Sequence, residues 1–528
     1  MLRYNLEVVR YNKNMLFNSY AFIFLFLPFT LIGFFMIGKK GHHRIAISWL
    51  VGASLFFYGW WNPAYLGLIL FSILFNYSIG VMLVKKVWSH EKSLLFIGIS
   101  GNIVLLGYFK YANFFVDNLN LAIGLDFNLK TIILPLAISF FTFQQIAYLV
   151  DAYKGKTREY NFLHYCLFVT FFPQLIAGPI VHHKEMMPQF AKDWVYKLNY
   201  DHLAIGITIF AVGLFKKVVL ADQFALYATP VFNGAASGEQ SMFFEAWFGA
   251  LAYSLQLYFD FSGYSDMAIG LSRMFNIRLP LNFNSPYKAS NIIDFWRRWH
   301  ITLSAFLREY LYIPLGGNRH GKFIRYRNIM ATMLLGGLWH GAGWNFIIWG
   351  GLHGAYLVLN HSWRTLIGTS AVPLGKFAHI FMIFLTFIAV TAAWVFFRAE
   401  NMDAAMSILS GMIGLNGISL PNQFYPFLSH MVRSDYIIFN GLAPLIGGGA
   451  GKVTICWLVG GLFVVWILPN VQQWLTHYSL ALDSSRNERQ ISWLSWRPTK
   501  VWAVMAGLVL GFALLNLKKT SQFLYFQF

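Results

Sequence analysis

Residues Met333–Gly351 read MLLGGLWHGAGWNFIIWGG, an apolar stretch rich in glycine and tryptophan with one histidine, His340, near its centre. Its length and its lack of Asp, Glu, Lys and Arg are typical of a helix inside a lipid bilayer, and we predict one helix through the whole stretch. Ionisable side chains in a bilayer usually face the interior of a helix bundle or a wet cavity, because lipid offers them no hydrogen bonds. The stretch therefore predicts a membrane protein with a buried histidine.

The rest of the chain has the composition of a protein with many membrane spans. Of its 528 residues, 57% are hydrophobic and only 12% are Asp, Glu, Lys or Arg, about half the charged fraction of a soluble protein. We predict an all-α polytopic membrane protein with about 11–12 transmembrane helices, and re-entrant or interfacial helices where Pro and Gly interrupt a run, as in Phe162–Val181. Apolar runs of roughly 16–21 residues, about enough to cross 30 Å of hydrocarbon, include Ala21–Gly38, Ile45–Trp60, Ala64–Val84, Thr131–Val150 and Val501–Leu517.

The formal net charge of +19 is explained by membrane topology, and we predict no nucleic-acid partner. Basic residues mostly flank apolar runs, as they do in the cytoplasmic loops of membrane proteins. The alternation puts the N-terminus outside and three basic loops in the cytoplasm: Lys39, Lys40 and Arg44; Lys85, Lys86 and Lys92; and Lys154, Lys156 and Arg158.

We predict one membrane domain, without internal repeats or soluble linkers. Residues 1–14 are polar and precede Met15, which would be a natural start before the apolar sequence MLFNSYAFIFLFLP, so we interpret them as an extension. The membrane domain covers residues 15–500, and residues 501–528 form a final transmembrane helix with the tail FLYFQF. Cys166 and Cys456 lie in apolar runs, where a thiol usually acts as a small hydrophobic group. We therefore predict no disulfide and no metal site.

A helix-breaking stretch, FFPQLIAGPIVHHKEMMPQF, contains Pro173, Gly178 and Pro179. Irregular backbone at membrane depth is tolerated only inside protein or beside a cavity. His182 and His183 follow this stretch, where we expect solvation. Adjacent residues of a helix point in different directions, which argues against a metal ion shared by these two histidines.

The most basic segment is Arg273–Arg327, with ten Lys or Arg residues and only two carboxylates. Its sequence IIDFWRRWHITLSAFLREYLYIPLGG has apolar residues at helical spacing, with aromatic and cationic residues between them. That pattern predicts helices at or dipping into the cytoplasmic interface. His300 lies in this segment beside Arg297 and Arg298. The arginine pair could bind the phosphates of a donor molecule at a tunnel mouth or anionic membrane lipids, and both interpretations stay open.

His300 and His340 together indicate one path from the cytoplasm into the membrane. Histidine is the side chain best suited to proton transfer near pH 7, and the glycines around His340 let a backbone or a ligand come close. The alternative is a histidine that only hydrogen-bonds a neighbouring helix. Asp260 and Asp266 fall in or beside an apolar stretch and must be paired there. They could orient a histidine or an arginine, or form a polar clasp between helices.

Four stretches resemble motifs of the membrane-bound O-acyltransferase family, above all its bacterial branch that acetylates alginate and other envelope polysaccharides. The resemblance runs from about Met15 to the C-terminus. It implies many helices around a central tunnel, with the acyl donor entering from the cytoplasm. The stretches are FPQLIAGPI, DFSGYSDMAIGLSRMFNIRLPLNFNSPY, FWRRWHITLSAFLREYLYIPLGGNR and LLGGLWHGAGWNFIIWGGLHG.

The resemblance also implies roles for single residues. The invariant histidine of the family falls on His340 in LWHGAGW, and a second polar position falls on His300 in FWRRWH; Trp339 and Asn345 are then supporting tunnel residues. The implied acyl donor is acetyl-CoA, with no permanently bound cofactor. We expect His340 to act as the base and His300 to polarise or position the thioester.

The tail FLYFQF resembles the C-terminal motif of a small single-span protein of D-alanylation systems. Tyr525 could then be a transient acyl acceptor, loaded at His340 and unloaded by a periplasmic partner. The alternative is an aromatic belt at the membrane interface, and Lys518 and Lys519 favour a cytoplasmic tail.

The predicted function is transfer of an acetyl group from a cytoplasmic donor across the bacterial inner membrane, for O-acetylation of an envelope or secreted polysaccharide. The acceptor would be alginate-like or peptidoglycan, reached through a periplasmic SGNH-type, esterase-like partner. A D-alanyl donor is one alternative. Another is a transporter or polysaccharide-export channel with a proton path through Asp260, Asp266 and His340, which predicts flux without acyl chemistry. A scaffold for a secretion machine gives no reason for a buried histidine among glycines.

Overall fold

The computed structural model describes residues 15–157, 159, 161–367, 375–428, 436–442, 446, 451–478, 481–482, 495–517 and 524. Within these ranges nearly all regular structure is helical, and the two strands, β1 (Ile418–Ser419) and β2 (Ile437–Ile438), form one short parallel pair. The predicted N-terminal extension, residues 1–14, and the predicted relay residue Tyr525 lie outside the described residues.

Five of the described helical segments are long and apolar enough to cross a bilayer: Phe22–Lys39, Ala64–Lys85, Glu91–Ile123, Tyr200–Ala236 and Lys376–Arg398. Two shorter apolar helices, Gly451–Trp466 and Lys500–Asn516, accompany them. The prediction of an all-α, multi-pass membrane protein is confirmed, whereas the count of 11–12 spans stays a prediction, because several further helices are shorter or more polar.

The chain forms two compact units, each built from segments that are distant in sequence. The first contains Met1–Phe215, Gly263–Asn282 and Val471–Gln527. In it α2 packs on α3, α4 and α5 pack on α7, and α11 packs on α23. Its elements are η1 (Phe22–Phe26), α2 (Leu27–Lys39), α3 (His43–Trp61), α4 (Ala64–Lys85), α5 (Glu91–Leu106), η2 (Gly107–Tyr111), α6 (Ala112–Ile123), α7 (Ile138–Tyr153), α8 (Phe162–Thr170), α9 (Phe172–Leu175), α10 (His183–Phe190), η3 (Asp193–Tyr196), α11 (Tyr200–Phe215), α22 (Val471–Trp474), η9 (Thr476–Tyr478) and α23 (Lys500–Asn516).

The run Phe162–Val181 does not form one helix. Helix α8 ends at Thr170, the single turn α9 follows, and the chain is irregular from Ile176 to Val181. A Cβ atom on Gly178 would lie 2.5 Å from the Cα atom of Gln174, so only glycine fits this return of the chain. The interruption expected from Pro and Gly is therefore present, and the buried irregular backbone lies inside protein.

The second unit contains Lys216–Ser262 and Phe283–Asn470. The long helix α13 (Phe243–Met274) contributes its residues up to Ser262 to this unit. The other elements are η4 (Lys216–Ala221), α12 (Asp222–Ala236), η5 (Pro286–Lys288), α14 (Ile292–Arg298), α15 (Ile301–Leu307), η6 (Arg308–Tyr312), α16 (Gly321–His340), α17 (Trp344–Ile367), α18 (Lys376–Arg398), α19 (Met402–Met412), η7 (Asn422–Phe424), α20 (Tyr425–Leu428) and α21 (Gly451–Trp466), with the strands β1 and β2.

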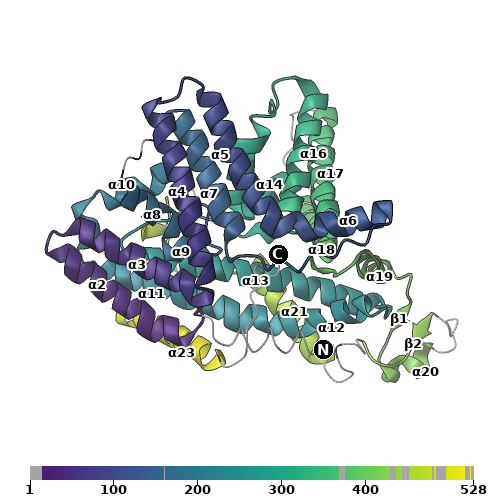
Figure 1. The fold of residues 1–528 in the computed structure, drawn as a ribbon. Coiled ribbons are helices and arrows are strands. Elements are labelled where there is room, and N and C mark those ends of the chain that lie inside the picture. Colours follow the sequence, from purple (N-terminus) through teal and green to yellow (C-terminus); the bar gives the residue numbers. More distant parts are fainter. Residues whose placement is uncertain are drawn as a thin grey trace. The chain divides into compact units, whose positions relative to one another are not determined.

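The prediction of one helix through Met333–Gly351 is wrong. Helix α16 ends at His340, and α17 begins at Trp344 and returns alongside it (Figure 1). Gly341 has extended backbone, and a Cβ atom there would lie 2.1 Å from the Phe346 ring. The glycines thus make a helical hairpin, and they place His340 at a helix end rather than in the middle of a span.

Two further glycines bring the hairpin backbones into contact. A Cβ atom on Gly337 would lie 2.2 Å from the carbonyl oxygen of Phe346, and one on Gly350 would lie 2.3 Å from the carbonyl oxygen of Met333. Real Cβ atoms do not approach an oxygen so closely. Small residues at these positions therefore decide how closely α16 and α17 pack, as in other membrane helix pairs.

Candidate active site

His340, the last residue of α16, lies in a box of aromatic rings. Its imidazole is 6% exposed. The ring contacts Trp339, Trp349 and Phe397 edge to face, at centroid distances of 4.9, 5.0 and 5.1 Å. These rings come from α16, α17 and α18, which all belong to the second unit. The arrangement excludes bulk water and fixes the orientation of the imidazole.

His300 lies at the junction of α14 and α15 and is fully buried. Its backbone has φ +43°, in the left-handed region that non-glycine residues rarely adopt. Such backbone strain is concentrated at functional sites. The ring contacts Phe261 at 4.7 Å and Trp339 at 6.2 Å. Trp339 therefore lies against both histidines, so the tertiary structure brings His300 and His340 to the same aromatic group.

A basic cavity of about 750 Å³ opens beside these elements, in the same unit. Its walls come from α14, α15, η6, the turn at Gly316–Gly317, α16 and α17. Among the lining residues that the structure describes there is no Asp or Glu. The charged or titratable lining residues are Arg297, Arg308, Tyr312, Arg319, Arg325 and His361. A cavity lined by arginines with no carboxylate has the electrostatics of an anion site, and guanidinium groups suit phosphate oxygens geometrically.

The two arginines beside His300 have different environments. Arg297 is exposed and lines the basic cavity. The Nε atom of Arg298 donates to Oδ1 of Asp294 at 3.0 Å, one helical turn earlier, and its side chain is not among the cavity residues. The structure therefore puts one member of the pair in position for an anionic ligand and occupies the other with an ion pair.

Comparison with known proteins identifies the family. Residues 153–399 match the model of the membrane-bound O-acyltransferase family. A peptidoglycan O-acetyltransferase of Helicobacter pylori is 44% identical over 544 aligned residues, which cover 97% of this chain and 98% of that protein. A probable alginate O-acetylase of Azotobacter vinelandii is 42% identical over 77% of this chain and 79% of that protein. A teichoic acid D-alanyltransferase of Streptococcus thermophilus is more distant, at 28% over 51% of this chain.

The chain belongs to the membrane-bound O-acyltransferase family. It is thus an enzyme, a multi-pass membrane O-acyltransferase, and the resemblance inferred from its motifs is confirmed. The matched region contains both predicted histidines and every residue of the basic cavity.

Two other predicted site residues of this acyltransferase, Asn345 and Asp260, form contacts that connect elements of the fold. Asn345, at the start of α17, donates from Nδ2 to the carbonyl oxygen of Ala399 at 2.8 Å and so joins α17 to the end of α18. Asp260 forms a close ion pair with the buried Lys217, which also contacts Asp222 at 3.2 Å. This pair joins η4 to α13 within the second unit, so the geometry is that of a polar clasp.

Asp266 lies further along α13, in the part that belongs to the first unit, and it is half-buried. Among the described residues no group of three or more His, Cys, Asp or Glu side chains could hold a metal ion.

A third buried histidine of the second unit, His353 on α17, was not among the predicted site residues. It is fully buried, and its ring contacts Trp349 at 4.8 Å and Trp296 at 5.2 Å. The sequence does carry a signal: His353 stands in GGLHG, whose flanking glycines repeat the setting of His340 in GGLWHG. The helical periodicity of the sequence does not show which face of α17 packs toward His340, so it could not place His353 near that residue.

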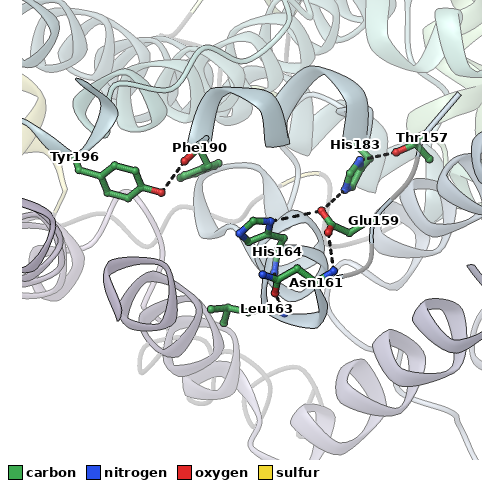
Figure 2. A network of polar contacts seen from close by, with 8 residues as sticks. All are labelled: Thr157, Glu159, Asn161, Leu163, His164, His183, Phe190 and Tyr196. Carbon is green, nitrogen blue, oxygen red and sulfur yellow. Dashed lines mark hydrogen bonds and ion pairs between the residues drawn. The ribbon is translucent and has the colours of Figure 1, made fainter. Parts of the chain in front are cut away.

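A second polar cluster lies in the first unit (Figure 2). His183 and His164 flank the Glu159 carboxylate, with Nε2 of His183 at 3.0 Å and Nδ1 of His164 at 3.7 Å from Oε2 (Figure 2). The backbone N–H of Asn161 donates to Oε1 at 2.8 Å, and Nδ1 of His183 lies 2.7 Å from the Thr157 hydroxyl. The expectation that His183 is solvated is wrong, because the cluster buries it to 8% exposure.

This polar cluster around Glu159, the Glu159 cluster, lowers the pKa of the Glu159 carboxyl group, which lies outside the membrane-spanning segments. Burial by itself raises the pKa, but hydrogen bonds from His164, His183 and the Asn161 backbone outweigh it and lower the pKa to about 2. Glu159 is therefore ionised at neutral pH. The cluster joins the start of α8 to the start of α10 and braces the irregular chain between them (Figure 2).

Proposed function

We propose that this acyltransferase moves an acetyl group from acetyl-CoA to hydroxyl groups of an envelope polysaccharide, alginate-like or peptidoglycan. The observation that carries the proposal is the shared setting of His340 and His300 against Trp339, beside a cavity lined by four arginines. The O-acetyltransferase names of the similar proteins from Helicobacter pylori and Azotobacter vinelandii support the same acyl group and the same class of acceptor.

In this proposal His340 acts as the general base. Its imidazole accepts the proton of an acceptor hydroxyl, and the hydroxyl oxygen attacks the thioester carbonyl carbon. The carbon–sulfur bond then breaks, and the leaving thiolate takes up the proton that His340 received. His300, held in a strained conformation and buried, polarises or positions the thioester carbonyl. The aromatic box around His340 keeps water from competing with the acceptor hydroxyl.

The basic cavity is proposed to hold the phosphates of the donor. Arg297 and Arg308 face it from α14 and η6, and Arg325 donates to Nδ1 of His361 at 2.6 Å, which holds that guanidinium in place. The hydrogen bond requires an unprotonated Nδ1 on His361. Guanidinium groups bind phosphate oxygens through charge-assisted hydrogen bonds that are about twice as strong as neutral ones.

The site of the final transfer is proposed to be periplasmic, with the enzyme in the bacterial inner membrane. An SGNH-type, esterase-like partner would receive the acetyl group and pass it to the polysaccharide. Tyr525, outside the described residues, would be the transient acceptor if its tail faces the periplasm. Cysteine labelling near Phe528 tests this relay, because a tail that reacts only from the cytoplasm rules it out.

The first experiment measures ester-linked acetate on envelope glycans of cells that lack the protein. The strain is complemented with wild type, His340→Ala or His300→Ala, matched for membrane level, and exopolysaccharide and peptidoglycan are assayed separately. We expect at least a 100-fold loss of transfer for His340→Ala, since general base catalysis contributes about 10²–10⁴-fold, and a smaller loss for His300→Ala. The glycan fraction that loses acetate identifies the acceptor.

The matched control is His379→Ala, which removes an exposed histidine from α18 in the same unit. It should leave acetate unchanged. Near-normal transfer by His340→Ala would refute the assignment of the base, and equal acetate in all strains, including the deletion, would refute acetylation.

A further inference from the structure

His353 has no structural explanation for its polarity. It is 0% exposed, and neither Nδ1 nor Nε2 has a hydrogen-bond partner among the described residues. A buried polar group without a partner costs about 1–3 kcal/mol, and the great majority of such groups in folded proteins are paired. An apolar ring of the same size would pack here without that cost, so packing alone does not explain an imidazole at this position.

Two tryptophan rings around His353 also have buried nitrogen atoms without a hydrogen-bond partner among the described residues. Trp296 and Trp349 both touch it, and the indole Nε1 atom of each is buried and has no hydrogen-bond partner in the part of the chain that the structure describes. Three rings in contact therefore carry buried nitrogen atoms without a hydrogen-bond partner among the described residues. This is the chemistry of a site for a ligand with hydrogen-bonding groups and apolar portions, rather than of a packed core.

These rings also connect the basic cavity to His340. Trp296 lines the cavity on one side and contacts His353 edge to face on the other, with an interplanar angle of 79°. His353 contacts Trp349 at 4.8 Å, and Trp349 contacts His340 at 5.0 Å. Trp296 also contacts Trp349 directly, at a ring-centroid distance of 5.9 Å, so Trp296, His353 and Trp349 form one ring cluster between the cavity and His340, all within the second unit.

We propose that His353 is a substrate-binding residue that hydrogen-bonds the acyl donor between the basic cavity and His340. Its ligand is a carbonyl or amide group next to the thioester, which accepts from or donates to the imidazole while the donor's phosphates stay among the arginines. This inference rests on the proposed donor site. It adds a binding group that touches the reacting end of the donor, in addition to the two histidines expected from sequence.

The test compares binding and stability in the same variants. His353→Phe keeps the ring size and removes both nitrogens, whereas His353→Gln keeps a hydrogen-bonding group. Wild type, both variants and His340→Ala are purified in lipid nanodiscs, and the Kd for radiolabelled acetyl-CoA and the thermal melting temperature are measured for each. We expect His353→Phe to raise the Kd at least 10-fold without lowering the melting temperature, because the unpaired polar group is gone. His353→Gln should recover most of the affinity.

His340→Ala separates this inference from the proposed function. It should bind acetyl-CoA nearly as well as wild type, because the base acts on the acceptor. A purely structural role for His353 predicts the opposite pattern: a lower melting temperature for His353→Phe with unchanged Kd, which would overturn the inference alone. Failure of wild type to bind acetyl-CoA would overturn the donor assignment as well. If His353→Phe is not recovered folded, the Kd of His353→Leu decides in the same way.

Discussion

The Glu159 cluster makes a quantitative prediction about acid stability. Replacing Glu159 by Gln removes the charge that His183 and His164 stabilise in the folded protein. The pKa falls from the ordinary value of 4.5 to about 2 on folding. At 1.36 kcal/mol per pKa unit, this difference corresponds to about 3 kcal/mol of folding free energy at neutral pH.

The sign of the pH dependence follows from the lowered pKa. A carboxyl group with a depressed folded pKa stabilises the folded state above its unfolded pKa, and the contribution is lost as the pH falls through the folded pKa. Wild type should therefore be more stable than Glu159→Gln by about 3 kcal/mol at pH 7. The difference should shrink as the pH falls from about 4.5 toward about 2.

Tryptophan-fluorescence melting of the purified protein in nanodiscs, from pH 7 down to pH 3, measures this difference. Glu239→Gln is the control, because Glu239 is an exposed carboxylate in the second unit. It should follow wild type at every pH. The stability difference between wild type and Glu159→Gln could also be the same at pH 7 and pH 3. That result would show that the charge of Glu159 does not stabilise the fold and that only the packing of the cluster matters.

Three further predictions concern the second unit. Gly350→Ala should separate α16 from α17, because its Cβ would lie 2.3 Å from the Met333 carbonyl oxygen. We expect a loss of about 1–3 kcal/mol in stability and a loss of acetyl transfer, measured by melting and by glycan acetate. Lys217→Met should cost about 3–5 kcal/mol by leaving Asp260 buried without its cation, and the double variant with Asp260→Leu should recover much of the melting temperature. Arg308→Gln should raise the KM for acetyl-CoA about 10-fold with little change in kcat, since a charge-assisted hydrogen bond contributes about 1.5–3 kcal/mol.

Two of these variants have a matched control, and the double variant tests the third. Gly351→Ala adds a Cβ 3.6 Å from Leu334, an ordinary contact, and should be tolerated. Arg364→Gln removes an exposed arginine of α17 that does not line the cavity, and it should leave KM unchanged. Equal effects of Gly350→Ala and Gly351→Ala would contradict the close contact of the hairpin. A double variant at Lys217 and Asp260 no more stable than Lys217→Met would contradict the clasp.

Composition and local motifs are enough to assign the class of the protein and its family. Long apolar runs and few charges require a helical membrane protein, because only structures that pair every backbone group internally survive in lipid. The motif around His340 led to the family, and the cost of burying an imidazole made His340 a candidate for function. His300 became a candidate through its place in the basic segment and in the motif FWRRWH. These conclusions depend on composition and local pattern, which do not change with the path of the chain.

Which side chains meet depends on how helices distant in sequence pack together. The apolar sequence predicted one helix through His340. The chain instead turns back there, because the close contacts at Gly341, Gly337 and Gly350 allow no side chain. The hydropathy of a sequence window contains no information about such contacts. The hydrogen-bond and ion-pair partners of single polar side chains could likewise not be predicted from the sequence. Asp260 meets Lys217, 43 positions earlier in the chain, and Glu159 meets His183 across an irregular segment.

His353 shows most clearly what the sequence could not predict. Its glycine-flanked position is visible in the sequence, but its lack of any hydrogen-bond partner is a property of the surrounding rings. Those rings come from α14 and α17, so their positions depend on how helices distant in sequence pack. Local pattern determines that a histidine is buried, whereas packing between helices decides whether it braces the fold or is left available for a substrate.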